Sequence, residues 1–386
     1  MAVPEGSPYG LDNLPYGVFA PPGGAPRVGV RVADSVVDLA ATLGDDVFAQ
    51  PSLNPFLAQG RARWLEVRRR VTDLVAGELP GGAVHPVAGV TLQLPFEVAD
   101  FVDFYASEHH AANLGRLFRP DSPPLLPNWK HLPVGYHGRA GTVVVSGTDI
   151  ARPSGQCKAP DENAPSYGPS RRLDVEAELG FVVGVGSSLG TPVRCADFAE
   201  HVFGAVLVND WSARDIQAWE YVPLGPFLGK SFATSISPWV VPLDALAAAR
   251  IARPPQQPEP LPYLREDPWG LDVDFLVEWN GTQVSRPPYR EMYWSPAQML
   301  AHLTVGGAST RTGDLYASGT VSGARRDQAG AFVELTWGGT EPVTVAGERR
   351  TFLEDGDEVV ISATAPAAGG GRLGLGEVRG RIVPAR

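Results

Sequence analysis

Leu173-Asp-Val-Glu-Ala-Glu-Leu-Gly-Phe-Val-Val183 carries the pattern that decides the fold class. Acidic and apolar residues alternate in its first half, so a strand places Asp174, Glu176 and Glu178 on one face and apolar side chains on the other. The segment continues as Phe181-Val-Val, which is apolar on both faces and is typical of a core strand. We therefore expect a β-strand that enters the core of the protein.

Short apolar runs of this kind recur along the chain, and glycine and proline separate them. The 386 residues include 44 glycines and 37 prolines, while 44% of all residues are hydrophobic. Glycine and proline thus exceed their usual combined share of roughly 12% without forming tracts. The expected strands cover residues 142–146, 173–185, 202–208, 238–242, 271–278, 333–337 and 359–363. Strands at this density predict a mainly β (α+β) protein that contains a sandwich or a roll.

The N-terminal part has its own pattern of elements. Short strands are expected at residues 16–20, 28–32 and 36–39, and an amphipathic helix is expected over about 56–77. The stretch from Pro86 to Pro95 is typical of a linker or of a strand entering a second region. We therefore place a boundary near residue 95 and expect two domains, 1–95 and 96–386.

Composition excludes several classes of function. The two cysteines, Cys157 and Cys195, have neither the spacing of a zinc site nor that of a disulfide framework. The formal net charge is −11 and the basic residues are scattered, which argues against nucleic-acid binding. No basic-then-apolar leader opens the sequence, and no apolar run approaches the roughly 18 residues of a membrane span. We expect a cytoplasmic protein that binds neither nucleic acid nor a membrane.

The three acids of the opening stretch repel one another if they share a strand face. They either form a solvated outer face or are neutralised by Ca²⁺ or Mg²⁺ through oxygen ligands. Because the strand runs directly into a core-like segment, the pattern favours the metal site.

A second cluster surrounds His110. Asp103 and Tyr105 share one side of an extended segment, and Ser107 can cap the following helix at the amide of His110. A histidine on an apolar helix face is usually a satisfied core residue. Its place in the first turn, however, points the imidazole toward the strand of Asp103, where it could act as a general base.

A third cluster follows an apolar strand that ends at Asn209-Asp210. A helix is expected to start there, so that Asp210, Arg214 and Gln217 project from one face. Either Asp210 caps this helix and pairs with Arg214, or it is a metal carboxylate beside donors that hold a developing oxyanion.

The segment Gly225-Pro-Phe-Leu-Gly-Lys-Ser is similar to a phosphate-binding loop only at first sight. Three residues separate its glycines where that motif requires four, and the flanking strand and helix are missing, so we reject nucleotide binding. Lys230 is one of only three lysines in the chain. It is either needed as a compact donor or present by chance.

Taken together, these segments resemble the fumarylacetoacetate hydrolase family over nearly the whole chain. The motifs are Asn13-Leu-Pro-Tyr-Gly-Val-Phe, Asp103-Phe-Tyr, His110-Ala-x-Asn, Leu132-Pro-Val-Gly-Tyr-His-Gly-Arg-Ala, Asp174-x-Glu-x-Glu, Asn209-Asp-Trp-Ser-Ala-Arg-Asp-Ile-Gln, the block from Trp219 to Phe232, and Ala317-Ser-Gly-Thr-Val-Ser-Gly. Motifs of this length in this order are specific.

The resemblance implies a small N-terminal SH3-like β-barrel, a larger C-terminal mixed β-roll or β-sandwich domain that bears the site, and a homodimer. It implies Mg²⁺ or Ca²⁺ bound by Asp103, Glu176, Glu178 and Asp210. Thr234 and Lys230 would then lie near the metal. Asp174 would be structural or would lie behind the metal ligands.

The resemblance also assigns roles to the other candidate residues. His110, held by Glu334 from the expected strand 333–337, would activate water. The oxyanion and leaving-group pocket would consist of Arg214, Gln217 and Lys230. The substrate carboxylate and keto oxygens would be bound by Tyr105, Arg119, Tyr136 and Thr320. The chain departs from the family at Glu108-His109, where a carboxylate touching the base would raise the pKa of that base.

The implied reaction is hydrolysis of the carbon–carbon bond of 4-fumarylacetoacetate to fumarate and acetoacetate, the last step of tyrosine and phenylalanine catabolism. The metal would stabilise the enolate leaving group. One alternative is a related acylpyruvate or diketo-acid hydrolase, or a hydratase or decarboxylase of the same superfamily. The alternative from another class is a noncatalytic calcium-binding protein whose carboxylates serve only structure.

Overall fold

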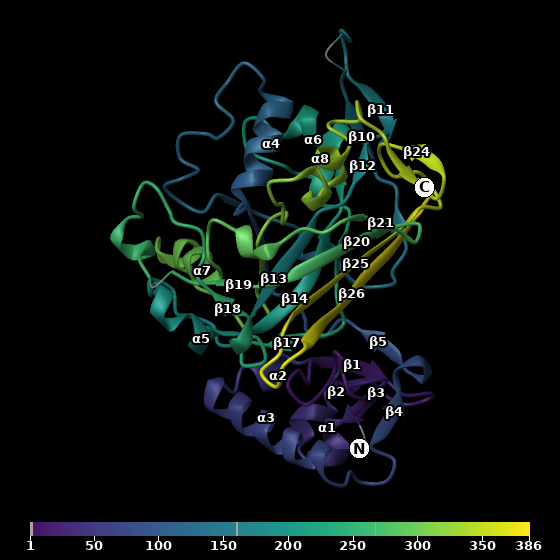
Figure 1. The fold of residues 1–386 in the computed structure, drawn as a ribbon, viewed down its shortest axis with the longest axis vertical. Helices are drawn as coiled ribbons and strands as arrows, with labels where there is room; N and C mark the ends of the chain where they lie inside the picture. Colours follow the sequence, from purple (N-terminus) through teal and green to yellow (C-terminus); the bar gives the residue numbers. More distant parts are fainter. Residues whose placement is uncertain (1–2, 160, 267) are drawn as a thin grey trace.

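The computed structural model describes residues 3–159, 161–266 and 268–386. Figure 1 shows a molecule dominated by strands, with the N-terminal sheet at one end and the C-terminal strands β25 and β26 running through the larger part. The predicted mainly β fold is confirmed. Among the described residues, no helix combines the length and the apolar character needed to cross a membrane.

A five-stranded antiparallel sheet forms the N-terminal end of the molecule. Its spatial order is β4 (Val84–Pro86), β3 (Ser35–Asp38), β2 (Arg27–Val32), β1 (Tyr16–Ala20) and β5 (Thr91–Gln93). The helices beside it are α1 (Leu39–Leu43), α2 (Asn54–Leu57) and α3 (Arg61–Ala76). The prediction of a single helix over 56–77 is wrong at its start. Gly60 has a φ of 83°, which interrupts the helix and separates α2 from α3.

A mixed sheet forms the centre of the larger part. Its order is β7 (Gly135–His137), β6 (Phe101–Phe104), β22 (Leu315–Ala317), β13 (Ala177–Val183), β14 (Val202–Asp210), β16 (Thr234–Ile236) and β8 (Val143–Val145), and β17 (Val241–Pro242) also pairs with β14. The pairs β6–β22 and β8–β16 are parallel, and the other neighbours are antiparallel.

A second sheet lies against the central sheet, with β26 next to β14. Its order is β21 (Thr282–Ser285), β20 (Asp274–Trp279), β25 (Glu358–Pro366), β26 (Arg372–Val383) and β9 (Ile150–Ala151). Four two-stranded pairs complete the strands: β10 (Ser154–Cys157) with β11 (Ser166–Pro169), β12 (Leu173–Asp174) with β15 (Ser212–Ala213), β18 (Arg250–Ile251) with β19 (Gly270–Leu271), and β23 (Val343–Val345) with β24 (Glu348–Arg350).

The remaining helices are short and surround the sheets. They are α4 (Glu108–Phe118), α5 (Phe198–His201), α6 (Arg214–Glu220), α7 (Pro296–Thr304) and α8 (Phe332–Leu335). Single 3-10 turns are η1 (Asp46–Ala49), η2 (Val87–Gly89), η3 (Ala140–Thr142), η4 (Cys195–Asp197), η5 (Leu228–Lys230), η6 (Ala247–Ala249), η7 (Pro262–Leu264), η8 (Tyr289–Glu291) and η9 (Arg326–Gln328).

Strand β14 is apolar from Val202 to Val208 because both of its faces are buried, and it ends in Asn209 and Asp210. Val206 and Val208 pack into the core shared with the N-terminal sheet, whereas Ala205 and Leu207 pack into the core between the two larger sheets. This period-2 division is what alternating side-chain directions require of a strand covered on both sides. The strand ends, where the chain leaves this packed region, are therefore the places at which polar groups can gather.

Two local predictions are wrong. The predicted strand over 333–337 is instead helix α8, in a segment whose Phe332 ring stacks on Trp279 with centroids 4.4 Å apart. The predicted continuous strand from residue 173 is interrupted at Val175 and Glu176, between β12 and β13. The interruption follows from pairing, since β12 pairs with β15 while β13 pairs with β14 and β22.

Candidate active site

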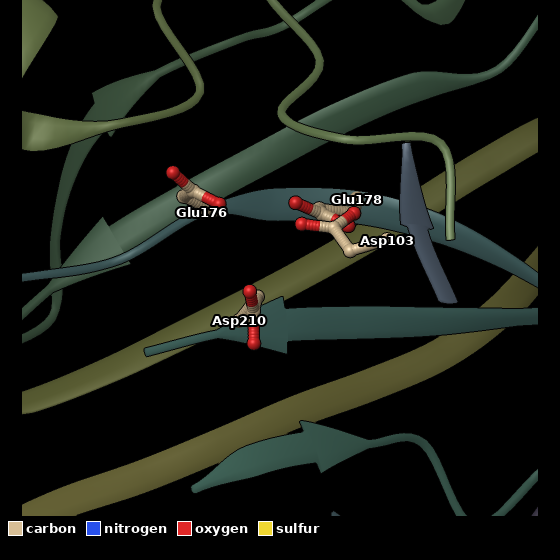
Figure 2. Close-up of side chains that lie close together, drawn as sticks. All are labelled: Asp103, Glu176, Glu178 and Asp210. Carbon is tan, nitrogen blue, oxygen red and sulfur yellow. The ribbon is translucent and has the colours of Figure 1, made fainter. Parts of the chain in front are cut away.

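Four carboxylates converge at one end of the central sheet, as Figure 2 shows. Asp103 comes from β6, Glu178 from the start of β13 and Asp210 from the end of β14, while Glu176 precedes β13. One oxygen from each lies within 4.8 Å of the others, and all four side chains are buried. The strand pairing causes this convergence, because β13 and β14 are antiparallel and the start of one meets the end of the other.

The environment of these acids is electrostatically unfavourable without a cation. Burial raises the pKa of Asp103 and of Glu178 well above the usual range, and neighbouring carboxylates raise both further. Neither oxygen of Glu178, nor Oδ1 of Asp103, has a hydrogen-bond partner among the described residues. Unpartnered buried carboxylate oxygens are rare, so these atoms call for a ligand.

The donor set fits a hard divalent cation. All four groups present carboxylate oxygens, which Mg²⁺ and Ca²⁺ prefer. Two cationic side chains, Lys230 and Arg214, contact the cluster, and Arg214 also pairs with Asp174. Carboxylates therefore outnumber the cations here, and a divalent ion would reduce the excess negative charge.

Lys230, from η5, is buried between two of the acids. Its Nζ lies 2.5 Å from Oε2 of Glu176 and 2.5 Å from Oδ2 of Asp210, and it donates to Oγ of Ser212 at 2.9 Å. Burial lowers the pKa of Lys230, but these carboxylates outweigh burial and raise it above its ordinary value. The lysine is therefore a charged group of the cluster. Among the described residues, Leu228–Lys230 forms η5, and strand β16 follows it.

Asp210 is further held by two hydroxyl groups. Thr234, its pairing partner on β16, donates from Oγ1 to Oδ1 at 2.6 Å, and the Tyr136 hydroxyl donates to Oδ2 at 3.1 Å. Burial raises the pKa of Tyr136, and Asp210 raises it further, so the phenol is a neutral donor. The structure thus places Thr234 beside the cluster.

Arg214 is the first residue of α6 and is almost completely enclosed. Its Nε donates to Oδ2 of Asp174 at 2.8 Å, its Nη2 lies 2.7 Å from Oε1 of Glu176, and its Nη1 donates to Oε1 of Gln217 at 3.1 Å. Burial raises the pKa of Glu176, but Lys230 and then Arg214 outweigh burial and hold this pKa below its usual range. The guanidinium is therefore fixed on three sides.

The predicted start of this helix is wrong. Asp210 is the last residue of β14, and Ser212 and Ala213 form β15, so the helix begins at Arg214. Asp210 neither caps the helix nor pairs with Arg214, because it contacts Lys230 instead. The prediction that Asp210, Arg214 and Gln217 share one helix face therefore fails, although all three belong to one site.

His110 and Glu334 form a buried pair. Ser107 caps α4 at the His110 amide at 3.3 Å, as predicted, and Nδ1 of His110 lies 2.6 Å from Oε2 of Glu334. Burial raises the pKa of Glu334, but the histidine and further hydrogen bonds lower it below its usual value. With Nδ1 committed to a carboxylate, Nε2 is the ring nitrogen left for chemistry.

These groups open onto a cavity of about 390 Å³. Ten of the predicted site residues line it: Asp103, Tyr105, His110, Arg119, Tyr136, Glu176, Arg214, Gln217, Lys230 and Thr320. Glu178, Asp210 and Glu334 lie behind this wall, next to Asp103, Lys230 and His110 respectively, and Thr234 contacts Asp210. Nε of Arg119 and Oγ1 of Thr320 are buried and lack hydrogen-bond partners within the described chain, so both are available to a ligand.

The neighbours of His110 in sequence point elsewhere. Glu108 forms a 2.7 Å ion pair with Lys130, and Nε2 of His109 lies 2.9 Å from Glu291. A carboxylate contact between Glu108 and the base, considered from the sequence, is therefore not formed.

Sequence reasoning missed three polar residues of the site. Asn113 donates to Oε1 of Glu334 at 2.9 Å, Ser322 donates to Oε2 of Glu334 at 2.9 Å, and Ser212 accepts from Lys230. Asn113 lies three residues after His110 on α4, so helical spacing could have identified it. Ser322 lies in the motif Ala317-Ser-Gly-Thr-Val-Ser-Gly, but that motif gave it no role, because its partner Glu334 is 12 residues away on a separate segment.

The fold defines a class of protein. A fumarylacetoacetate hydrolase from Exiguobacterium antarcticum superposes with a TM-score of 0.60 at 19% identity, covering 97% of this chain and 100% of that one. A maleylpyruvate hydrolase from Sphingobium sp. SYK-6, in complex with manganese(II) and pyruvate, superposes with a TM-score of 0.56 at 16% identity, covering 97% of this chain and 100% of that one. At such identities these similarities establish the fold.

Sequence comparison gives the family. Residues 12–95 match the fumarylacetoacetase N-terminal family, and residues 100–383 match the fumarylacetoacetate hydrolase C-terminal family. The chain is 45% identical to the fumarylacetoacetase of Homo sapiens, over 100% of this chain and 98% of that protein. It is 46% identical to that of Caenorhabditis elegans, over 100% and 99%. The chain belongs to the fumarylacetoacetate hydrolase family and is a hydrolase.

Proposed function

We propose that this protein hydrolyses the carbon–carbon bond of 4-fumarylacetoacetate, giving fumarate and acetoacetate. The observation that carries the proposal is the His110–Glu334 pair, which opens onto the same cavity as the buried acid cluster. Curated fumarylacetoacetases that match the chain over nearly its whole length at 41–46% identity support the choice of substrate.

His110 serves as the general base. Glu334 is ionised and accepts the proton on Nδ1, so Nε2 carries a lone pair that can take a proton from water. The water oxygen bonds to the carbonyl carbon on the fumaryl side, and the bond from that carbon to the methylene between the two carbonyl groups breaks. This methylene becomes the methyl group of acetoacetate when it takes up a proton. The proton taken by His110 is then available to the leaving carbon.

Asp103, Glu176, Glu178 and Asp210 would hold Mg²⁺ or Ca²⁺. When bound, such a cation supplies Lewis-acid stabilisation of the negative charge that develops on the dicarbonyl group. The choice between the two cations belongs to this proposal, and the carboxylate donor set supports either.

Arg214 and Gln217 donate to the oxyanion and the leaving group, and Lys230 stabilises them through its positive charge, because its three N–H groups already point at Glu176, Asp210 and Ser212. The carbonyl oxygen of Gln217 accepts from Arg214, which leaves the Gln217 amide N–H groups free to donate into the cavity. Fixed donors of this kind contribute about 3 kcal/mol each to lowering a barrier, because they need no reorganisation during the reaction.

Tyr105, Arg119, Tyr136 and Thr320 bind the substrate. The free donor atoms of Arg119 and Thr320 support this role. Burial raises the pKa of Tyr105, so its hydroxyl is a neutral donor on the cavity wall. Arg119 provides the charge that a dicarboxylate requires in a protein of net charge −11.

We further propose that the enzyme is a cytoplasmic homodimer with a domain boundary near residue 95. The two family matches, which meet near that residue, support the boundary. Exposed apolar side chains beside the cavity mouth, including Leu224 and Phe227, support a subunit contact. Sedimentation velocity tests the dimer: a monomer at micromolar concentration would contradict it.

The proposed function is tested by following the ultraviolet absorbance of the conjugated diketone of fumarylacetoacetate. We expect the absorbance to fall with the wild-type protein, to persist after treatment with a chelator, and to fall again when Mg²⁺ or Ca²⁺ is restored. A noncatalytic calcium-binding protein would give no loss under any condition. Turnover of acylpyruvates at an equal or higher kcat/KM would favour the related diketo-acid hydrolases.

A further inference from the structure

Asp174 is a fully buried carboxylate outside the acid cluster. Its Oδ1 accepts from the amides of Val175 at 2.8 Å and Phe332 at 2.7 Å. Its Oδ2 accepts from Nε of Arg214 at 2.8 Å and from the amide of Val333 at 3.2 Å. Four donors therefore occupy the two oxygens, which leaves no free lone pair for a cation.

Two of these bonds go to the first turn of α8. Phe332 and Val333 are its first two residues, and Glu334 is the third. The position of Glu334, and with it the hydrogen bond to Nδ1 of His110, therefore depends on where Asp174 holds this turn. Because α8 has only four residues, its own hydrogen bonds provide little rigidity.

The third bond goes to a different element. Arg214 lies at the start of α6, 40 residues further along the chain than Asp174, and it is the cation beside Glu176. Asp174 itself is fixed by the pairing of β12 with β15, which directly precedes α6. One carboxylate thus connects the segment that carries Arg214 to the segment that carries Glu334.

We propose that Asp174 is a positioning residue that fixes Arg214 and the His110–Glu334 pair relative to each other. The role in turnover rests on the proposed function, in which Arg214 stabilises the oxyanion and His110 activates water. Both groups must meet the same carbonyl group, so their separation must be set within a fraction of an ångström. Misplacement by about 1 Å costs about 100-fold in rate.

Asp174→Asn tests this role with little change in side-chain volume. Whichever way the amide is oriented, its NH₂ group faces two N–H donors, either those of Val175 and Phe332 or those of Arg214 and Val333. In the first orientation α8 keeps only the hydrogen bond from Val333, and in the second Arg214 loses its bond and α8 keeps only that from Phe332. Either way the variant weakens the link between the two segments. Asp174→Ala is the second variant, since it removes the carboxylate without placing a new donor against the old ones.

Asp38→Asn is the matched control. Asp38 is also buried, forms a 3.2 Å ion pair with Arg27, and accepts from the amide of Ala41 at the start of the short helix α1. It has the same chemistry as Asp174 but belongs to the N-terminal sheet. Its replacement should lower the thermal unfolding temperature and leave kcat and KM of the folded enzyme within about twofold, since it lies far from the cavity.

Two readouts are needed on the full chain. In steady-state kinetics below the unfolding temperature, we expect kcat of Asp174→Asn to fall about 100-fold while KM changes less than about threefold. In hydrogen–deuterium exchange without substrate, we expect a peptide covering 329–337 to exchange about tenfold faster in Asp174→Asn and at the wild-type rate in Asp38→Asn.

The results separate failure of this proposal from failure of the proposed function. If the wild-type protein hydrolyses fumarylacetoacetate and Asp174→Asn keeps kcat within threefold, the positioning role is overturned while the function stands. If the wild-type protein shows no turnover, the proposed function is wrong. Hydrogen–deuterium exchange of the peptide 329–337 then decides whether Asp174 orders α8. If both Asp174 variants fail to fold while Asp38→Asn folds, Asp174 is a structural residue and the proposal is wrong.

Discussion

Two regions of the central sheet are equally buried but differ in their chemistry. The face toward the N-terminal sheet is packed with rings: Phe203 makes edge contacts with Tyr16 and Trp64, each with centroids 5.4 Å apart. The end of the same sheet holds four acids, two of which, Asp103 and Glu178, have unpartnered oxygens. Burial of the first region stabilises the folded protein, whereas burial of the second region destabilises it.

The buried acids at the end of the central sheet therefore lower the stability of the folded protein. The desolvation of unpartnered carboxylates raises the free energy of the folded chain, so other interactions must offset it. The nearest such interactions are the apolar contacts on the face of the sheet toward the N-terminal sheet. Such a cost is retained only where a ligand or a reaction requires it. The comparison therefore predicts that substitutions in the two regions act on different observables.

The largest effect should come from the base at the acidic end. His110→Ala should lower kcat about 10²- to 10⁴-fold, the usual loss when general-base catalysis is removed. Binding of a product-like ligand should persist, because Arg119 and Thr320 remain. Stopped-flow or steady-state absorbance measures the rate, and calorimetry measures the binding. Turnover within about tenfold of wild type would show that another group activates the water.

The next effect should come from the apolar face. Phe203→Ala should lower the free energy of unfolding by about 3–5 kcal/mol, because a buried ring is replaced by a cavity between two sheets. The kcat of the protein that remains folded should be unchanged. Denaturant unfolding and kinetics on the same preparation check both values. A selective loss of kcat would mean that the two regions are not independent.

A smaller effect is expected at the substrate carboxylate. Arg119→Leu should raise KM about 10- to 100-fold, the equivalent of one charged hydrogen bond, with kcat nearly unchanged. Arg116→Leu, on the neighbouring exposed part of α4, is the matched control. An unchanged KM with a collapsed kcat would move Arg119 from binding to chemistry.

The smallest effect distinguishes the two kinds of buried acid. In chelator-treated protein, Glu178→Gln should raise the free energy of unfolding by about 1–2 kcal/mol, because it removes an uncompensated buried charge. Asp174→Asn should lower it, because Asp174 accepts four hydrogen bonds. Urea unfolding gives both signs. Destabilisation by Glu178→Gln would contradict the idea that the cluster is costly without a cation.

The sequence predicted well what depends on local periodicity. The alternation before Phe181 predicted β13, and the apolar run before Asp210 predicted β14. The acids of these two strands lie together in the structure. The sequence predicted poorly what depends on pairing between distant segments. The break between β12 and β13 and the late start of α6 follow from the pairing of β12 with β15, which no local pattern reports.

The contacts within the site were still harder to predict, because they join residues that are far apart in the sequence. His110 and Glu334 are 224 residues apart, and Lys230 and Glu176 are 54 apart, so only the family resemblance could join them before the fold was known. The resemblance described Asp174 only as structural or as lying behind the metal ligands. Three of its four hydrogen-bond partners are backbone amides, and two of these belong to α8. The sequence pattern predicted a strand over 333–337, whereas residues 332–335 form a helix whose first amides donate to Asp174. These partners could therefore not be predicted.

Calorimetric titration of chelator-treated protein with Mg²⁺ and with Ca²⁺ tests whether the acid cluster is a metal site. We expect a single divalent ion per chain, bound by the wild-type protein and by Asp174→Asn but not by Asp103→Asn. The contradicting result is absence of binding to the wild-type protein, or binding that Asp103→Asn leaves unchanged.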